Sequence, residues 1–197
     1  MGVAVDVPRF ATTWRGIAGA DLRGIASFHL RGDRHVWTSF DGYFGEVQVD
    51  SVVRLDSGVL KVSVDLPRAE PDAVRALWPD WPVQAVAAGH VEATGVTEHL
   101  ATTATLRVGG SVLDAKGITR LSGDVGVNLE VTGKDVDLRG IWPEMPETRV
   151  NGFTTLSLWN SPQGVAAEVN AQTNAFEVAG VTVPGLDLTG ALEQGRF

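Results

Sequence analysis

The chain contains no cysteine, no run of basic residues and no long apolar segment. The lack of cysteine excludes disulfide bonds, thiolate chemistry and cysteine-ligated metal sites. The 197 residues carry a net charge of −8, which argues against binding nucleic acid or an anionic membrane surface through charge. No apolar run approaches the roughly 20 residues of a membrane helix, and no signal peptide is visible. We therefore expect either a cytoplasmic protein or an internal stretch of a longer one.

A short sequence motif near the start of the chain is repeated twice, once closely and once in weaker form. Residues 3–9 (VAVDVPR) return as residues 62–68 (VSVDLPR), and residues 127–131 (VNLEV) form the weaker copy. The starts of the copies are 59 and 65 residues apart, which indicates one structural unit repeated along an axis. We expect a single elongated repeat domain over residues 1–197, with units at about 3–58, 62–123 and 127–190. Such an array forms an extended surface more readily than a single catalytic pocket.

Most of the chain alternates apolar and polar residues with a period of two, which predicts strands with one apolar face. The 23 glycines and nine prolines fit many turns between such strands. The expected fold class is therefore mostly β: repeated antiparallel strands forming an elongated curled sheet, a β-groove, with short helices or crossing loops. The apolar positions expected to line this groove are Val47, Val49, Val53, Leu55, Val62, Val64, Leu66, Leu106, Val108, Val127, Leu129, Val131, Val165 and Val169.

Two segments depart from this alternation and predict short helices. Residues 70–78 place Pro71 in a first helical turn and end before Pro79, and residues 135–142 do the same before Pro143. Each unit is therefore expected to hold about four strands and one short helix or crossing loop. Tryptophans in these segments are expected to anchor the crossing elements on the sheet, and the alternative is that they line a ligand groove. They are Trp78, Trp81 and Trp142.

No set of residues points to catalysis, a cofactor or a metal. The histidines lack the close spacing of metal ligands, and we expect them on polar strand faces. They are His29, His35, His90 and His99. Asp6, Asp65 and Glu130 occupy the same repeat position, which favours an architectural role. Because no nucleophile elbow, phosphate loop or dinucleotide motif is present, we do not expect an enzyme.

One pattern covers essentially the whole chain and is densest between Val131 and Leu192. Alternating strands end in Ser/Thr-Gly pairs, and a short element at residues 137–141 (DLRGI) precedes residues 146–152 (PETRVNG), which open a Gly-led strand. Residues 178–190 (VAGVTVPGLDLTG) complete this pattern. It resembles the AsmA-like superfamily, and within it the TamB (translocation and assembly module) group.

The resemblance implies a long groove with an apolar interior in the periplasm of a Gram-negative bacterium, held in the inner membrane by an N-terminal helix. It implies a role in moving phospholipid or another acyl-chain lipid between the membranes, and in outer-membrane biogenesis and protein assembly. The implied partners are such lipids, outer-membrane assembly proteins and the remainder of a longer chain. The alternative is a structural or adhesive β-repeat interaction module whose apolar face forms a closed core. The many small inward candidates (valine, alanine and threonine) favour the open groove.

Overall fold

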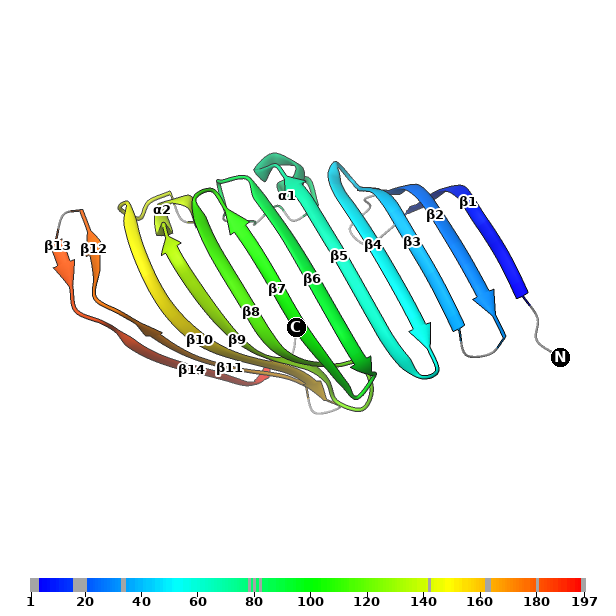
Figure 1. Cartoon of the computed structure of the whole chain (residues 1–197). Coiled ribbons are helices and arrows are strands. Elements are labelled where there is room, and N and C mark those ends of the chain that lie inside the picture. Colours follow the sequence, from blue (N-terminus) through cyan, green and yellow to red (C-terminus); the bar gives the residue numbers. More distant parts are fainter. Residues whose placement is uncertain are drawn as a thin grey trace.

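The computed structural model shows a continuous antiparallel sheet that runs through the whole described chain (Figure 1). It describes residues 4–15, 21–32, 35–77, 79, 81, 83–141, 143–161, 164–179 and 181–195. The strands are β1 (Ala4–Arg15), β2 (Asp21–Arg31), β3 (His35–Phe44), β4 (Val47–Asp56), β5 (Val59–Ala69), β6 (Ala87–Val96), β7 (His99–Val108), β8 (Ser111–Arg120), β9 (Val125–Val136), β10 (Thr148–Ser161), β11 (Gly164–Thr173), β12 (Phe176–Val178), β13 (Val181–Val183) and β14 (Asp187–Gly195).

The strand order follows the sequence from β1 to β11 and then passes to β14, while the β12–β13 hairpin pairs with the start of β10. All these pairs are antiparallel, so the predicted fold class is confirmed. Short turns make this order possible. Between β4 and β5, for example, Ser57 and Gly58 both have positive φ angles, 49° and 88°, which suit the twist of a two-residue hairpin.

The repeated Pro-Arg pair marks a bulge in both close copies of the motif. In β1 the pairing slips between Val7 and Phe10, and in β5 it slips between Leu66 and Ala69. Each bulge therefore contains the Pro-Arg pair. Proline has no N–H to donate to a sheet, so the extra residue is accommodated where a ladder hydrogen bond is already missing. The sequence repeat thus has a direct structural counterpart.

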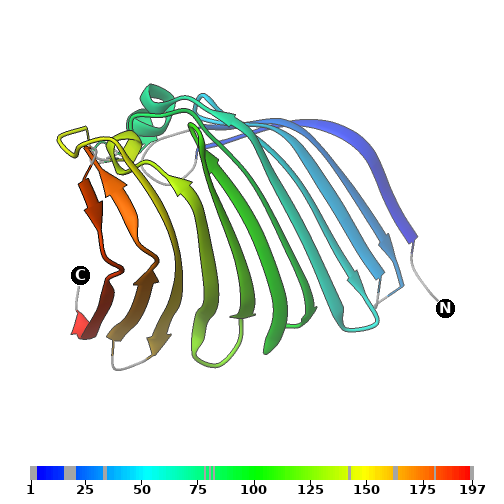
Figure 2. The same ribbon diagram turned by 60° about the vertical axis from the view of Figure 1, so that its left-hand side comes forward.

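Two short helices lie along one edge of the sheet (Figures 1 and 2). Helix α1 (Pro71–Leu77) forms where residues 70–78 predict it. Helix α2 (Leu138–Ile141) is shorter than the predicted 135–142, because β9 continues to Val136. Four residues do not make a stable helix alone. Polar contacts hold this one: the Thr148 hydroxyl accepts a hydrogen bond from the Leu138 N–H at 2.7 Å, and Asp137 Oδ1 accepts one from the Thr148 N–H at 3.1 Å.

A buried apolar cluster lies where α1 and the segment after it pack on the sheet. Ala73 of α1 and Val83 are buried against Ala69, Ala87 and Val108 of the sheet. Trp81 packs against this cluster, as expected of an anchor for the crossing element. Trp78 and Trp142 lie outside the described residues. The crossing segments also touch one another, because the Gln84 N–H donates to the Gly140 carbonyl of α2 at 3.0 Å.

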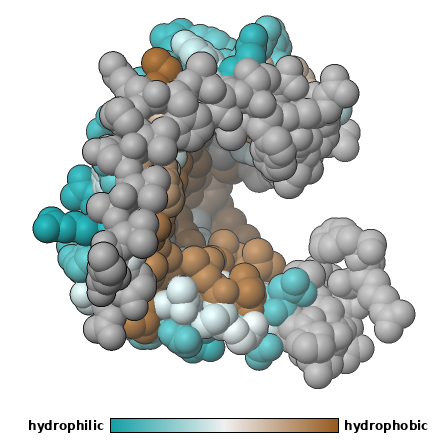
Figure 3. Space-filling view, turned by 90° about the vertical axis from the view of Figure 1, so that its right-hand side faces the viewer, coloured by the Kyte–Doolittle hydropathy of each residue, from teal (hydrophilic) through white to brown (hydrophobic). Residues whose placement is uncertain are grey.

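The sheet curls into a trough and does not close. Viewed along the sheet, the described residues surround an apolar hollow, and the exterior that they form is largely hydrophilic (Figure 3). Within the described residues, β1 and β14 are the two ends of the strand order and do not pair with each other. Neither described helix has the length and hydrophobicity needed to cross a membrane.

Candidate functional site: the apolar groove

One face of the sheet, here called the inner face, carries the apolar residues that the sequence analysis singles out. Strand pairing places Val53 opposite Val62, and it places Val64 opposite Val91. Following this register from strand to strand puts all fourteen predicted groove positions on the same face. For Val165 the register alone gives this placement, since its burial is not described. Whether these residues contact lipid stays a prediction.

Among the described residues, the inner face carries no charged side chain. At every paired inner-face position from β2 to β11, the described side chain is apolar, or the residue is glycine, serine, threonine or asparagine. The few hydroxyl groups there can satisfy one another: Thr102 donates to Thr119 at 2.8 Å on the neighbouring strand. The inner face therefore provides a continuous surface suited to apolar groups, with little to recognise a polar one.

Part of this face is not covered by the protein itself. Val91 is 40% exposed, Leu158 is 43% exposed and Val169 is 36% exposed, although all three point to the inner side of the curl. Nearer the helices the same face is filled, and Val108 is buried beneath the crossing segment. The space-filling view shows the hollow that remains, lined by hydrophobic residues (Figure 3). The candidate site is this uncovered stretch of the inner face, which we call the groove.

Sequence reasoning missed the aromatic part of the groove. Phe28 of β2 and Phe40 and Phe44 of β3 lie on the inner face, in register with the predicted residues of β4. The signal was present, because β3 alternates as Val36, Thr38, Phe40, Gly42 and Phe44. The threonine and glycine in this series make β3 less apolar in sequence than the other strands that form the inner face.

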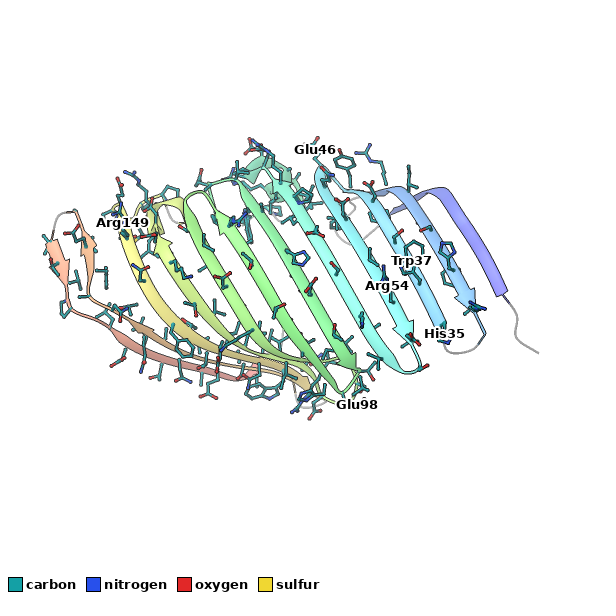
Figure 4. All side chains as sticks on the ribbon, in the orientation of Figure 1. His35, Trp37, Glu46, Arg54, Glu98 and Arg149 are labelled. Carbon is teal, nitrogen blue, oxygen red and sulfur yellow. The ribbon has the colours of Figure 1, made fainter. Side chains whose placement is uncertain are left out.

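The opposite, outer face carries the charged and polar side chains. Within the described side chains, His29, His35, His90 and His99 all fall on this face by register, as predicted. His29 packs on Trp37 with ring centroids 4.5 Å apart, and Trp37 lies next to Arg54 on the neighbouring strand (Figure 4).

A row of acidic residues crosses the outer face of β3, β4 and β5. Asp50 of β4 lies directly opposite Asp41 of β3 on one side and Asp65 of β5 on the other. Burial raises the pKa of the Asp50 carboxyl above its ordinary value, and the neighbouring carboxylates of Asp41 and Asp65 raise it further. The row continues to His90, whose Nδ1 lies 2.6 Å from Asp65 Oδ1. This hydrogen bond raises the pKa of His90, and Glu92 adds to the effect.

These outer-face groups do not form a metal site. No cluster of three or more histidine, aspartate or glutamate side chains in the described part of the chain has the geometry to hold a metal ion. The repeat position shared by Asp6, Asp65 and Glu130 instead makes cross-strand contacts: Asp65 pairs with His90, and Glu130 forms an ion pair with Lys116 at 3.0 Å. The backbone of Asp6 lies opposite His29 in the same manner.

The inner face can therefore sequester apolar chains, while the outer face remains in contact with water. Comparison of the chain with family models, with curated proteins and with solved structures finds no match.

Proposed function

We propose that this chain is a segment of a lipid-binding β-groove that holds acyl chains against the inner face and conducts them along it. The observation that carries this proposal is the uncharged inner face from β2 to β11, whose apolar side chains Val91, Leu158 and Val169 are left exposed. A folded domain that simply needed a core would cover such side chains. Their exposure along an open trough fits a surface that a separate apolar molecule completes.

The energetics support the same proposal. Burying one methylene group is favourable by about 0.8 kcal/mol. Exposing two acyl chains of about sixteen carbons to water therefore costs more than about 20 kcal/mol of free energy. A trough with an apolar wall along its whole length removes most of this free-energy cost. With strands spaced about 4.8 Å apart, the twelve-strand path through the described residues runs for about 50 Å, longer than one such chain.

The open cross-section lets a polar headgroup remain in solvent. An acyl-chain lipid has a tail that the groove suits and a headgroup that an uncharged wall would not accommodate. The occupant we propose is therefore a phospholipid or another lipid with acyl chains. No group on the inner face would have to bind its head.

The resemblance to the AsmA-like superfamily and its TamB group supplies the proposed setting. In that setting the groove lies in the periplasm of a Gram-negative bacterium, as part of a longer chain anchored in the inner membrane. It carries lipid towards the outer membrane and supports outer-membrane biogenesis, with outer-membrane assembly proteins as partners. The closed-core alternative receives less support, since the described sheet is open and its inner face is only partly covered.

The test is to purify the chain from a bacterial host, extract it with organic solvent and quantify the bound lipid by mass spectrometry. Acyl-chain lipid is expected to co-purify in near-stoichiometric amount. The variant Val91→Asp places a carboxylate in the groove at a side chain already 40% exposed, so folding can be retained. Bound lipid should fall at least about tenfold, because a charge beside an acyl chain is strongly unfavourable.

The matched control is Thr94→Asp on the same strand. Thr94 lies on the outer face, opposite Lys61, and the new carboxylate stays exposed to solvent there. This variant should retain its lipid. A folded wild-type chain that carries no lipid would contradict the proposal, as would equal lipid in both variants. Val64→Asp and Leu129→Asp extend the test to less exposed positions of the same wall.

A further inference from the structure

A cavity on the outer face, across β8, β9 and β10, is not part of the groove. Its volume is about 700 Å³, within the roughly 300–1,000 Å³ typical of clefts that bind small molecules. Its side chains include Ile118, Asn128, Ser157 and Trp159 together with charges of both signs. We propose that this cavity binds an uncharged saccharide.

A glycine forms the floor of this cavity. Gly126 of β9 lies between Arg120 of β8 and Trp159 of β10, directly opposite both. Because Gly126 has no side chain, a gap separates Arg120 from Trp159 across two strand spacings, about 10 Å. A Cβ atom at Gly126 would come within 2.8 Å of the Trp159 Cβ, so the floor fits only glycine without a shift of the strands.

The apolar wall of the cavity offers a surface for one face of a sugar ring. Trp159 is 38% exposed, although an indole side chain is favourable to bury. Ile118 lies two residues along from Arg120, on the same side of β8. The C–H face of a pyranose ring is apolar and can lie against such a flat side chain, while its hydroxyl groups project from the ring edge.

The polar groups of the cavity favour a ligand without net charge. Lys116 and Arg120 are balanced by Asp124 and Glu130, and Lys116 already forms an ion pair with Glu130 at 3.0 Å. An anionic ligand would meet the two carboxylates, and a cationic ligand would meet the two basic groups. Hydroxyl groups both donate and accept hydrogen bonds, so they can use both kinds of partner.

Amide and hydroxyl side chains add to this set. Asn128 and Ser157 lie opposite each other on β9 and β10, one row along from Gly126 and Trp159. Each offers a donor and an acceptor to a ligand seated on Trp159. The cavity thus combines one flat apolar wall with paired donors and acceptors. Because it is on the other face of the sheet, this proposal does not depend on what the groove holds.

The experiment is isothermal titration calorimetry of the full chain with three neutral probes: maltotriose, cellotriose and chitotriose. At least one should bind with a dissociation constant between about 10 μM and 1 mM. Trp159→Ala should weaken that binding at least about tenfold, and Asn128→Ala should weaken it by a smaller factor. Phe153→Ala is the matched control, since Phe153 lies on the same strand and face, is 40% exposed and is not part of this cavity.

Three results would overturn the saccharide proposal. The first is no heat of binding for any of the three probes up to about 10 mM. The second is tighter binding of a charged trimer, tri-galacturonic acid or tri-glucosamine, than of the neutral probes. The third is binding that Trp159→Ala and Asn128→Ala leave unchanged while circular dichroism shows both variants folded.

Discussion

At the scale of single residues, the outer face has unfavourable like-charge contacts that the inner face avoids. Like charges directly opposite each other on neighbouring strands are destabilising, and Asp50 faces an aspartate on both sides. Burial raises the pKa of the Asp50 carboxyl, and the facing carboxylates of Asp41 and Asp65 raise it further. A carboxyl whose pKa is raised by folding binds protons more tightly in the folded state. The stability that this protonation contributes is therefore present below the ordinary aspartate pKa and is lost as the pH rises through the raised folded-state pKa.

Asp50→Asn should consequently stabilise the chain at pH 7. The gain expected is about 0.2–1 kcal/mol in the free energy of unfolding for each of the two repulsive contacts removed, measured by urea denaturation. The gain should disappear near pH 3, below the ordinary aspartate value of 3.8, because the wild-type carboxyl is then protonated in both states.

Asp114→Asn provides the comparison for this change. The Asp114 carboxylate accepts a hydrogen bond from the Thr105 hydroxyl at 2.9 Å, and replacement by an amide weakens this bond because the acceptor loses its charge. This variant should not be stabilised at either pH. If Asp50→Asn were no more stable than the wild type at pH 7, Asp41 and Asp65 would not exert the repulsion inferred here.

At the scale of elements, glycine lets neighbouring strands approach closely. Gly24 and Gly42 face each other on β2 and β3. A Cβ atom at Gly42 would meet the Arg23 carbonyl oxygen and would lie 2.6 Å from the Gly24 Cα and 2.7 Å from the Phe40 ring. The first two of these are backbone atoms and cannot rotate away. The two strands therefore depend on the absence of a side chain at this point.

Gly42→Ala should destabilise the chain by about 1–3 kcal/mol, because the added methyl group has to push two strands apart. Gly110→Ala is the control, since nothing lies within 4 Å of a Cβ at Gly110. Its free energy of unfolding should stay within about 0.5 kcal/mol of the wild-type value. Equal effects of the two substitutions would show that the close approach at Gly42 carries no energetic weight.

Much of the element order could be predicted from the sequence, because strand alternation has a period of two and the strands pair in chain order. The register between neighbouring strands was harder to predict. The alternation around Val62 and Val127 predicts one apolar face for each strand, but it does not reveal which residues lie opposite each other. The cavity at Gly126 depends on that register, because Arg120 and Trp159 come from strands far apart in the sequence. No pattern within β8 or β10 alone indicates that they meet.

The second helix illustrates a different limit. Residues 135–142 have the proline stop and apolar content of a short helix, yet β9 extends to Val136. The helix propensity of residues 135 and 136 is outweighed by their pairing with β10, which places Val136 opposite Val150. Thr148, only 6% exposed, then holds the start of α2 from a strand that the sequence pattern does not connect to it.

At the scale of the whole molecule, the groove leaves apolar area in water unless something occupies it. The chain stripped of lipid should therefore bind an apolar dye such as 1-anilinonaphthalene-8-sulfonate while its circular dichroism remains that of a folded β protein. Added oleate should displace the dye. A folded, lipid-free chain that neither binds the dye nor releases it to oleate would contradict this expectation.

The open side of the trough has a consequence for how it would be loaded, if it holds acyl chains as proposed. A closed tube fills only from its ends, so its contents wait in single file and one stuck molecule stops all the others. The described sheet does not close, and its hollow is open to one side instead (Figure 3). If the trough holds acyl chains as proposed, a molecule could enter or leave sideways where the inner face is uncovered, and the time to load the trough need not grow with its length. An obstruction at one strand would leave the remaining strands in use.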